Sequence, residues 1–265
     1  MPTLAVNGAE LYHEVRGDGP PLLLIMGMTG DAGHFEGFAD LLADEFTVVT
    51  YDRRGNGRSP RPSGWTSTSP EEQADDAAAL LDSLGLAPAA VYGSSSGGTF
   101  ALCLLIRHPE TVRGAVLHEA PFVSLFDDPG ARAEVTALVQ EGMEAGGPPA
   151  VLERLWRYVA GDAGWERLEP GLRGRMQASA DTLLDVELGS YESFLPDEET
   201  LASVAAPVLV LVSEQGPAVY GQAAGRMAER LGVEVTCTPG THTAYHDRPH
   251  ELAETIRQFL REVSS

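Results

Sequence analysis

The sequence predicts an α/β protein with a mostly parallel, doubly wound sheet of about eight strands and an inserted helical cap. Short apolar runs alternate with longer amphipathic stretches before about residue 122 and again after about residue 204. The segment between these two parts keeps helical periodicity without a strand pattern. A length of 265 residues suits one such domain better than two. We therefore expect a core formed by residues 1–122 and 204–265 and a cap formed by residues 123–203.

The first elements of the core follow from their polarity patterns. Residues 11–15 alternate like a half-exposed strand, whereas residues 21–26 are continuously apolar, as in a buried strand. Residues 46–52 are expected to form a second buried strand. A helix is expected between these two, over residues 35–44. The stretch 69–86 combines a Ser cap, a Pro in the first turn, early acids and a terminal Gly, which together predict a helix.

The rest of the core continues the alternation of strand and helix. Such an order folds into a parallel sheet with right-handed crossovers. A helical block inserted in this kind of sheet covers the carboxyl ends of the strands, where ligands bind. The expected strands are 89–93, 113–120, 206–214 and 233–240, and the expected helices are 98–109, 218–231 and 249–263.

The composition excludes several classes of function. The net charge of −21 opposes binding to nucleic acid or to an anionic membrane surface, since no basic patch exists to neutralise phosphates. The chain has no lysine, so it has neither a P-loop lysine nor a Schiff-base lysine. It lacks an apolar segment of the ~18 residues that a membrane span needs, and the N-terminus lacks a signal-peptide pattern. We expect a cytoplasmic monomer or homodimer.

The stretch "GSSSG" at residues 93–97 fits the pattern G-x-S-x-G between an expected strand and an expected helix. This placement is typical of a nucleophile elbow, in which a sharp turn exposes the central serine, here Ser95. The backbone N–H of Ser96 would then contribute to an oxyanion hole at the helix N-terminus. A turn without chemistry is the simpler alternative. A phosphate cradle is excluded because neither G-x-x-x-x-G-K nor G-x-G-x-x-G occurs here.

A serine nucleophile needs a base, and His242 is the best placed of the seven histidines. It follows a Pro-Gly turn between the last expected strand and the last expected helix. His242, His246 and His250 recur at intervals of four, which would suit a metal site on a helix. Pro249 and the preceding turn residues oppose a continuous helix through all three. We expect neither a metal nor a cofactor.

Three motifs together resemble those of the α/β-hydrolase superfamily. "YDRRGNGRSPRP" (51–62) is similar to the family's D-x-R-G-x-G-x-S, "GSSSGG" to its elbow and "PGTHTAYHDRP" to its histidine loop. The resemblance implies a serine hydrolase that works without a cofactor. It also implies an oxyanion loop at "LLIMGMTGD", where Met26 replaces the usual histidine before Gly27 and the backbone N–H of Met28 is the second oxyanion donor.

The acid of the implied triad departs from the family pattern. The usual aspartate follows the strand "PVLVLVSEQGP", but Gly216 occupies its position. Glu119, which ends the strand "GAVLHE" after the nucleophile's helix, is the candidate that we prefer, as haloalkane dehalogenases and zearalenone lactonases have a similar arrangement. Glu214 is the runner-up, followed by Asp127 and Asp128.

The resemblance is nearest to zearalenone-hydrolase-type lactonases. It implies a carboxylic ester or lactone of a small apolar molecule as substrate, such as a zearalenone-like macrolactone. Met28, Trp156 and Leu183 are the candidates for contact with substrate, although the cap does not match and the lactonases' tryptophan lacks a clear counterpart. Further aromatic and Met residues of the cap would either line the pocket or belong to the core: Met143, Tyr158, Trp165 and Met176.

Two other functions remain open at this point. A cofactor-free perhydrolase or carbon–carbon hydrolase would use the same triad. A hydrolase-like binding protein without catalysis is favoured by Gly216 and opposed by the intact Ser95 and His242.

Overall fold

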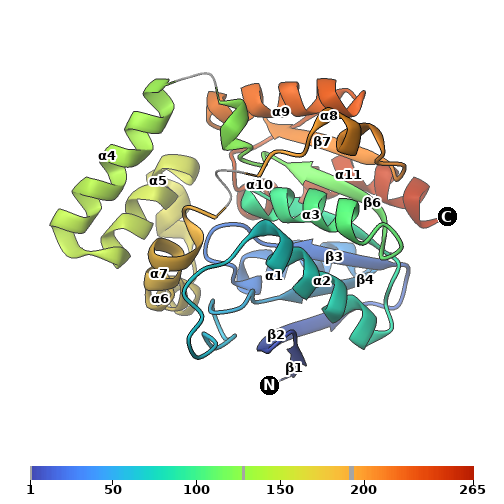
Figure 1. The fold of residues 1–265 in the computed structure, drawn as a ribbon, viewed down its shortest axis with the longest axis horizontal. Helices are drawn as coiled ribbons and strands as arrows, with labels where there is room; N and C mark the ends of the chain where they lie inside the picture. Colours follow the sequence, from blue (N-terminus) through green and yellow to red (C-terminus); the bar gives the residue numbers. More distant parts are fainter. Residues whose placement is uncertain (1, 127–128, 191–193) are drawn as a thin grey trace.

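Eight strands form one twisted sheet in the computed structural model, which describes residues 2–126, 129–190 and 194–265 (Figure 1). The strand order is β1-β2-β4-β3-β5-β6-β7-β8; β1 and β2 pair antiparallel and β3 to β8 run parallel. The predicted mostly parallel sheet is thus confirmed, with β1 added at its edge. The strands are β1 (Thr3–Val6), β2 (Ala9–Arg16), β3 (Pro21–Ile25), β4 (Thr47–Tyr51), β5 (Ala89–Ser94), β6 (Val112–His118), β7 (Val208–Ser213) and β8 (Val235–Thr238).

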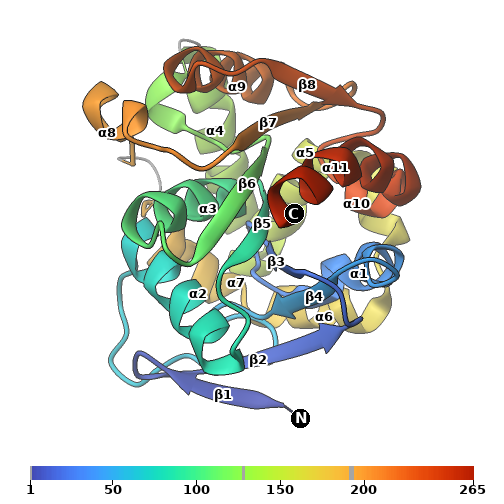
Figure 2. The same cartoon turned by 90° about the vertical axis from the view of Figure 1, so that its right-hand side faces the viewer.

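Helices cover both faces of the sheet, as the buried strands require. Side chains along β3 alternate between two apolar clusters: Leu23 packs with α2 and α3, whereas Leu22 and Leu24 pack with α1 and α11. Figure 2 shows α2 and α3 on one side of the twisted sheet and α1 and α11 on the other. The core helices are η1 (Ala32–Phe35), α1 (Glu36–Leu42), α2 (Pro70–Leu84), α3 (Ser96–Arg107), α9 (Ala218–Leu231), α10 (Ala244–Asp247) and α11 (Pro249–Ser264).

The described residues between β6 and β7 form helices and loops without a strand, and this segment is called the helical insertion below. In Figure 1 its helices α4 to α7 lie together on the left, beside the sheet. The long α5 is interrupted at Gly161, whose φ of 72° lies in the left-handed region. The insertion contains η2 (Val123–Leu125), α4 (Pro129–Gly146), α5 (Pro148–Arg167), α6 (Pro170–Ala178), α7 (Ala180–Thr182), the π-helical turn η3 (Leu183–Glu187) and α8 (Glu198–Ala202).

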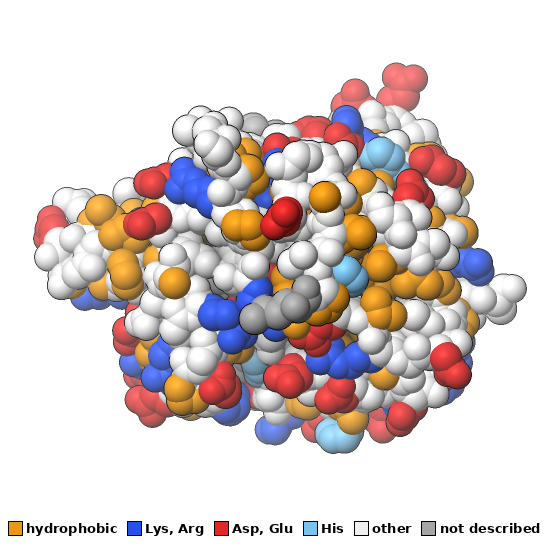
Figure 3. All heavy atoms as spheres, turned by 90° about the horizontal axis from the view of Figure 1, so that it is seen from below, with side chains coloured by type: hydrophobic (Ala, Val, Ile, Leu, Met, Phe, Trp, Pro, Cys, Tyr) orange, Lys and Arg blue, Asp and Glu red, His pale blue; other side chains and the backbone are white. Residues whose placement is uncertain are grey.

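Positive and negative side chains are interspersed on the surface. On the face shown in Figure 3, arginines lie between acidic side chains, without a continuous basic area. Of the helices in the described part of the chain, none is both long enough and apolar enough to span a membrane.

Candidate active site

The central serine of "GSSSG" occupies a sharp turn between β5 and α3. Ser95 has φ 55° and ψ −132°, a backbone conformation that is rare for a residue with a side chain. Its N–H donates to the carbonyl of His118 at 2.9 Å, and its carbonyl accepts from Gly98 at 2.7 Å. These bonds hold the turn, and Ser95 is half-buried while Ser94 and Ser96 are buried.

Two glycines make this turn possible. A Cβ at Gly93 would lie 2.2 Å from the carbonyl oxygen of Gly97, and a Cβ at Gly97 would lie 2.1 Å from that of Ile25. Both distances are far below van der Waals contact, so larger residues would force the strand and the helix apart. The spacing of glycines in the motif therefore has a steric cause.

The predicted base and acid form a buried pair. Nδ1 of His242 lies 2.6 Å from Oε2 of Glu119, and both residues are almost fully shielded from solvent. The other carboxylate oxygen, Oε1, accepts the backbone N–H of Ser213 at 2.9 Å. Burial by itself raises the pKa of the Glu119 carboxyl, but the hydrogen bond and charge of His242 leave this pKa below its ordinary value. The carboxylate is therefore ionised and can orient the imidazole.

Gly216 leaves room for the carboxylate of Glu119, the predicted acid. A Cβ at residue 216 would lie 2.0 Å from Oε1 of Glu119, so the glutamate carboxylate fills the space next to the glycine backbone. The runner-up, Glu214, is exposed. Asp127 and Asp128 lie outside the described residues.

A second buried histidine, His118, shares a hydrogen-bonding partner with Glu119. His118 is fully buried and bonds through Nδ1 to the hydroxyl of Tyr92 at 2.6 Å and through Nε2 to the hydroxyl of Ser213 at 2.9 Å. Burial lowers the pKa of His118 to about 4, so its ring is neutral at pH 7. Ser213 also donates its N–H to Glu119, so a continuous chain of hydrogen bonds holds the Glu119 carboxylate in position.

Because these buried histidines are neutral in the folded protein, we predict that low pH destabilises the fold. The pKa of His118 is about 4 in the folded protein and about 6.5 in an unfolded chain. Between these values the unfolded state binds more protons, so stability falls as the pH drops from 6.5 towards 4. Burial likewise lowers the pKa of His34. We expect His118 alone to lower the free energy of unfolding by about 2 kcal/mol between pH 7 and pH 5.

Urea denaturation at pH 7 and pH 5 measures this effect. His118→Gln can keep a hydrogen bond to Tyr92 or Ser213 but cannot titrate, so its stability should change less between the two pH values than that of the wild type. His250→Gln, at an exposed position, is the matched control and should behave as the wild type. Equal pH dependence in His118→Gln and wild type would contradict the prediction.

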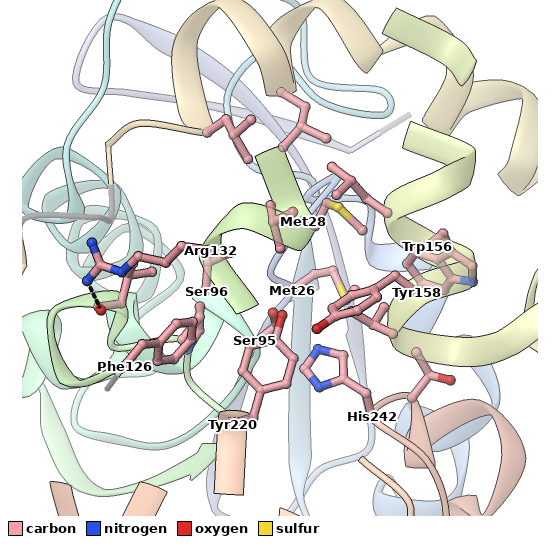
Figure 4. A pocket seen from close by; sticks show the side chains of 18 of the residues that line it. Met26, Met28, Ser95, Ser96, Phe126, Arg132, Trp156, Tyr158, Tyr220 and His242 are labelled. Atoms are coloured by element: carbon pink, nitrogen blue, oxygen red, sulfur yellow. Dashed lines mark hydrogen bonds between the residues drawn. The ribbon is translucent and has the colours of Figure 1, made fainter. Parts of the chain in front are cut away.

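An aromatic ring that sequence reasoning missed packs against the histidine. Tyr220, from α9, stacks on His242 with ring centroids 4.7 Å apart and an angle of 20° between the planes. It also lies in the wall of the cavity that contains Ser95 (Figure 4). Its position in "AVYGQ" gave no motif, and only the packing of α9 beside the histidine loop brings it to the site.

The cavity beside Ser95 and His242 measures about 320 Å³ and is lined mainly by apolar side chains. The three residues predicted to contact substrate, Met28, Trp156 and Leu183, all lie in its wall. Figure 4 shows Ser95 and His242 on the same cavity, with Met28 nearby. The cavity also has polar positions at Arg132 and Thr136 on α4 and at Tyr158 on α5.

The other cap residues considered from the sequence divide between pocket, core and surface. Tyr158 lines the cavity. Trp165 and Met176 are buried in the apolar cluster that joins the insertion to the core, and neither of them lines the cavity. Met143 is 49% exposed on α4. Helical periodicity alone could not separate these three environments.

The loop after β3 lies directly against the elbow. A Cβ at Gly27 would lie 2.8 Å from Cβ of Ser95 and 2.9 Å from the backbone nitrogen of Ser96, so only glycine allows this approach. The N–H of Gly30 bonds to the carbonyl of Gly27, and Thr29 has a positive φ of 73°, as at the third position of a type II turn. The predicted oxyanion donors, Met28 and Ser96, both border the cavity.

These groups come together because each follows the carboxyl end of a neighbouring strand. The predicted oxyanion loop follows β3, and the strands β5, β6, β7 and β8 are followed in turn by Ser95, Glu119, Gly216 and His242. In an open parallel sheet this edge is where ligands bind. The described residues contain no cluster of His, Cys, Asp and Glu suited to a metal ion.

Comparison with known proteins agrees with this architecture. Residues 20–249 match the family described as alpha/beta hydrolase fold. An uncharacterized hydrolase, YraK of Bacillus subtilis, is 32% identical over 263 residues, which is 97% of this chain and 95% of the relative. A zearalenone hydrolase of Cladophialophora bantiana is 28% identical over 278 residues, covering 97% of this chain and 96% of the relative. A thermophilic esterase structure from Thermogutta terrifontis superposes with a TM-score of 0.79 at 26% identity, covering 99% and 97% of the two chains.

The fold and the elbow thus define the class, a hydrolase built on an α/β sheet. The chain belongs to the α/β-hydrolase family. The resemblance seen in its motifs is confirmed, including the likeness to zearalenone hydrolases.

Proposed function

We propose that the protein is a serine hydrolase that cleaves a carboxylic ester or lactone of a small apolar molecule through Ser95, His242 and Glu119. The observation that carries the proposal is the half-buried serine of a strained elbow on the same apolar cavity as a buried His–Glu pair with a 2.6 Å contact. The esterase and zearalenone hydrolase among its relatives support the choice of ester and lactone substrates.

The chemistry follows from the placement of these groups. Nε2 of His242 accepts the proton of the Ser95 hydroxyl as its oxygen attacks the substrate carbonyl carbon. The backbone N–H groups of Met28 and Ser96 stabilise the oxyanion that forms. Glu119 holds the Nδ1–H tautomer and stabilises the positively charged ring. His242 then protonates the leaving oxygen, and the acyl group stays on Ser95.

Water completes the cycle by the same groups. His242 takes a proton from a water molecule, whose oxygen attacks the acyl carbonyl, and the proton returns to the serine oxygen as the acid product leaves. An ester yields an acid and an alcohol. A lactone yields a single hydroxy acid, because both products remain linked.

The helical insertion supports the preference for an apolar substrate. We propose that residues 123–203 act as the cap of this enzyme and that residues 1–122 and 204–265 form its core. Val135 on α4, Leu155 and Trp156 on α5 and Leu183 on η3 contribute to the apolar wall above the serine. A cavity of about 320 Å³ sets an approximate limit on the part of a substrate that can be enclosed.

Labelling with a fluorophosphonate probe tests the proposal directly. The probe reacts with a serine oxygen only when a base removes its proton and an oxyanion hole receives the phosphoryl oxygen. We expect the wild type to be labelled at one site, identified by peptide mass spectrometry as Ser95, and to hydrolyse p-nitrophenyl butyrate. Absence of both labelling and ester hydrolysis would instead support a binding protein of the same fold.

A further inference from the structure

The loop that follows β4 contains a completely buried arginine. Arg53 and Glu187 each expose 0% of their side chains, and they form a two-pronged ion pair with distances of 2.7 and 2.9 Å. Arg53 belongs to the core, whereas Glu187 ends the π-helical turn η3 of the helical insertion. A fully buried charge pair persists only when its hydrogen bonds are well satisfied, so the partners of Arg53 indicate its role.

Each of the five N–H groups of the Arg53 guanidinium has its own hydrogen-bond acceptor. Nη1 and Nη2 each donate to one oxygen of Glu187, and Nη1 also donates to Oε1 of Gln73 at 3.1 Å. Two further bonds go to the oxyanion loop: Nε donates to the carbonyl of Met26 at 2.9 Å and Nη2 to that of Gly27 at 2.8 Å. The backbone N–H of Arg53 adds a bond to the carbonyl of Gly30 at 2.8 Å.

The hydrogen bond from Arg53 to the Gly27 carbonyl affects the direction of the next N–H group, that of Met28. In a trans peptide the C=O and the following N–H point in opposite directions. A Gly27 carbonyl held towards Arg53 therefore turns the N–H of Met28 to the opposite side of the loop. Gly27 itself packs against Ser95, with a virtual Cβ only 2.8 Å from that of the serine. The arginine is thus placed to aim this N–H towards the carbonyl that Ser95 attacks.

The same loop contains strain that needs an external restraint. Thr29 is β-branched and has a φ of 73°, a backbone conformation that is unfavourable for such a residue. Its hydroxyl bonds to Nε2 of His34 at 3.1 Å, which fixes one side of the turn. Arg53 fixes the other side through the carbonyls.

We propose that Arg53, held in place by Glu187, is a positioning residue for the oxyanion hole. Docking of η3 against the core then sets the direction of the Met28 N–H, so the helical insertion contributes to the rate of the reaction as well as to the pocket wall. The inference rests on the proposed ester hydrolysis for its kinetic consequence, whereas its structural consequence, the orientation of the Gly27–Met28 peptide, is independent of that activity.

Arg53→Met alone would leave Glu187 charged and unpaired in the core, so lost activity could reflect poor folding. The double variant Arg53→Met/Glu187→Met removes both charges and should recover much of the melting temperature that the single variant loses. It still lacks the donors to the two carbonyls. We expect kcat for p-nitrophenyl butyrate to fall about 100-fold in both variants, the effect of losing one oxyanion donor, with KM changed by less than about threefold.

A neighbouring ion pair provides the matched control. Arg54 makes a similar two-pronged pair with Asp76, and its other hydrogen bonds go to Glu72 and the carbonyl of Asn7. Arg54→Met/Asp76→Met should lower stability but leave kcat within about threefold of the wild type. A double variant at Arg53 and Glu187 that folds and keeps a wild-type kcat would overturn the proposal.

A crystal structure of the Arg53→Met/Glu187→Met variant gives the second readout. We expect the Gly27–Met28 peptide to be rotated or to occupy several orientations. An unchanged peptide would overturn the inference even if the kinetics were altered. This measurement also separates the two proposals, because a wild type without ester hydrolysis would refute the proposed function while the orientation of the peptide still decides the role of Arg53.

Discussion

Ser95→Ala is expected to lower kcat for p-nitrophenyl butyrate by about 10⁶-fold, the loss typical of removing the nucleophile of a serine triad. The variant should unfold near the wild-type temperature, because the serine side chain is half-buried and the turn is held by backbone bonds. Alanine keeps the Cβ, so the elbow conformation is preserved. Turnover measured with a large excess of enzyme, together with thermal unfolding, checks both expectations.

Ser94→Ala is the matched control for this experiment. Ser94 precedes the nucleophile and is buried at the end of β5, away from the cavity wall. We expect this variant to keep kcat within about tenfold of the wild type. An inactive Ser94→Ala variant beside an active Ser95→Ala variant would show that the nucleophile has been assigned to the wrong serine.

Glu119→Gln is expected to lower kcat by up to about 10⁴-fold with little change in fold. Glutamine has nearly the same shape, and its carbonyl oxygen can still accept the N–H of Ser213. Its NH₂ group then faces Nδ1 of His242 and favours the wrong tautomer, and the charge that stabilised the protonated ring is gone. The pH dependence of kcat, measured beside Glu214→Gln, checks this role.

The exposed Glu214 should tolerate the same change with kcat altered by less than about twofold. A Glu214→Gln variant as impaired as Glu119→Gln would contradict the assignment of the acid.

The position of the acid can also be moved by design. Adding an aspartate at residue 216 to the Glu119→Gln variant would force the side chain of residue 119 to move, because a Cβ at residue 216 would lie 2.0 Å from the position of Oε1 of Glu119. Glu119→Gly/Gly216→Asp removes that clash, and glycine suits the positive φ of 47° at residue 119. The kcat of this double variant should be at least tenfold higher than that of the Glu119→Gly single variant. No recovery would mean that the aspartate cannot reach His242 from β7.

Sequence alone determined those features that depend on neighbours along the chain. The alternation of apolar and amphipathic segments predicted the sheet, because buried parallel strands and the helices that cover them differ in periodicity. The turn at Ser95 was predictable from Gly93 and Gly97, since the backbone of a tight elbow excludes side chains at these local positions. The choice of Glu119 as the proposed acid followed from the order of strands, because Gly216 has no carboxylate.

Only the tertiary structure decided which distant groups meet. Tyr220 reaches His242 because α9 packs beside the histidine loop, and Arg53 meets Glu187 across 134 positions of sequence because η3 docks on the core. Neither contact has a local signal: a tyrosine on a helix and an arginine in a loop are ordinary surface residues until the fold buries them. Burial then removes competing water, so each polar group must find a partner inside the protein, and that requirement decides the hydrogen bonds around the oxyanion loop.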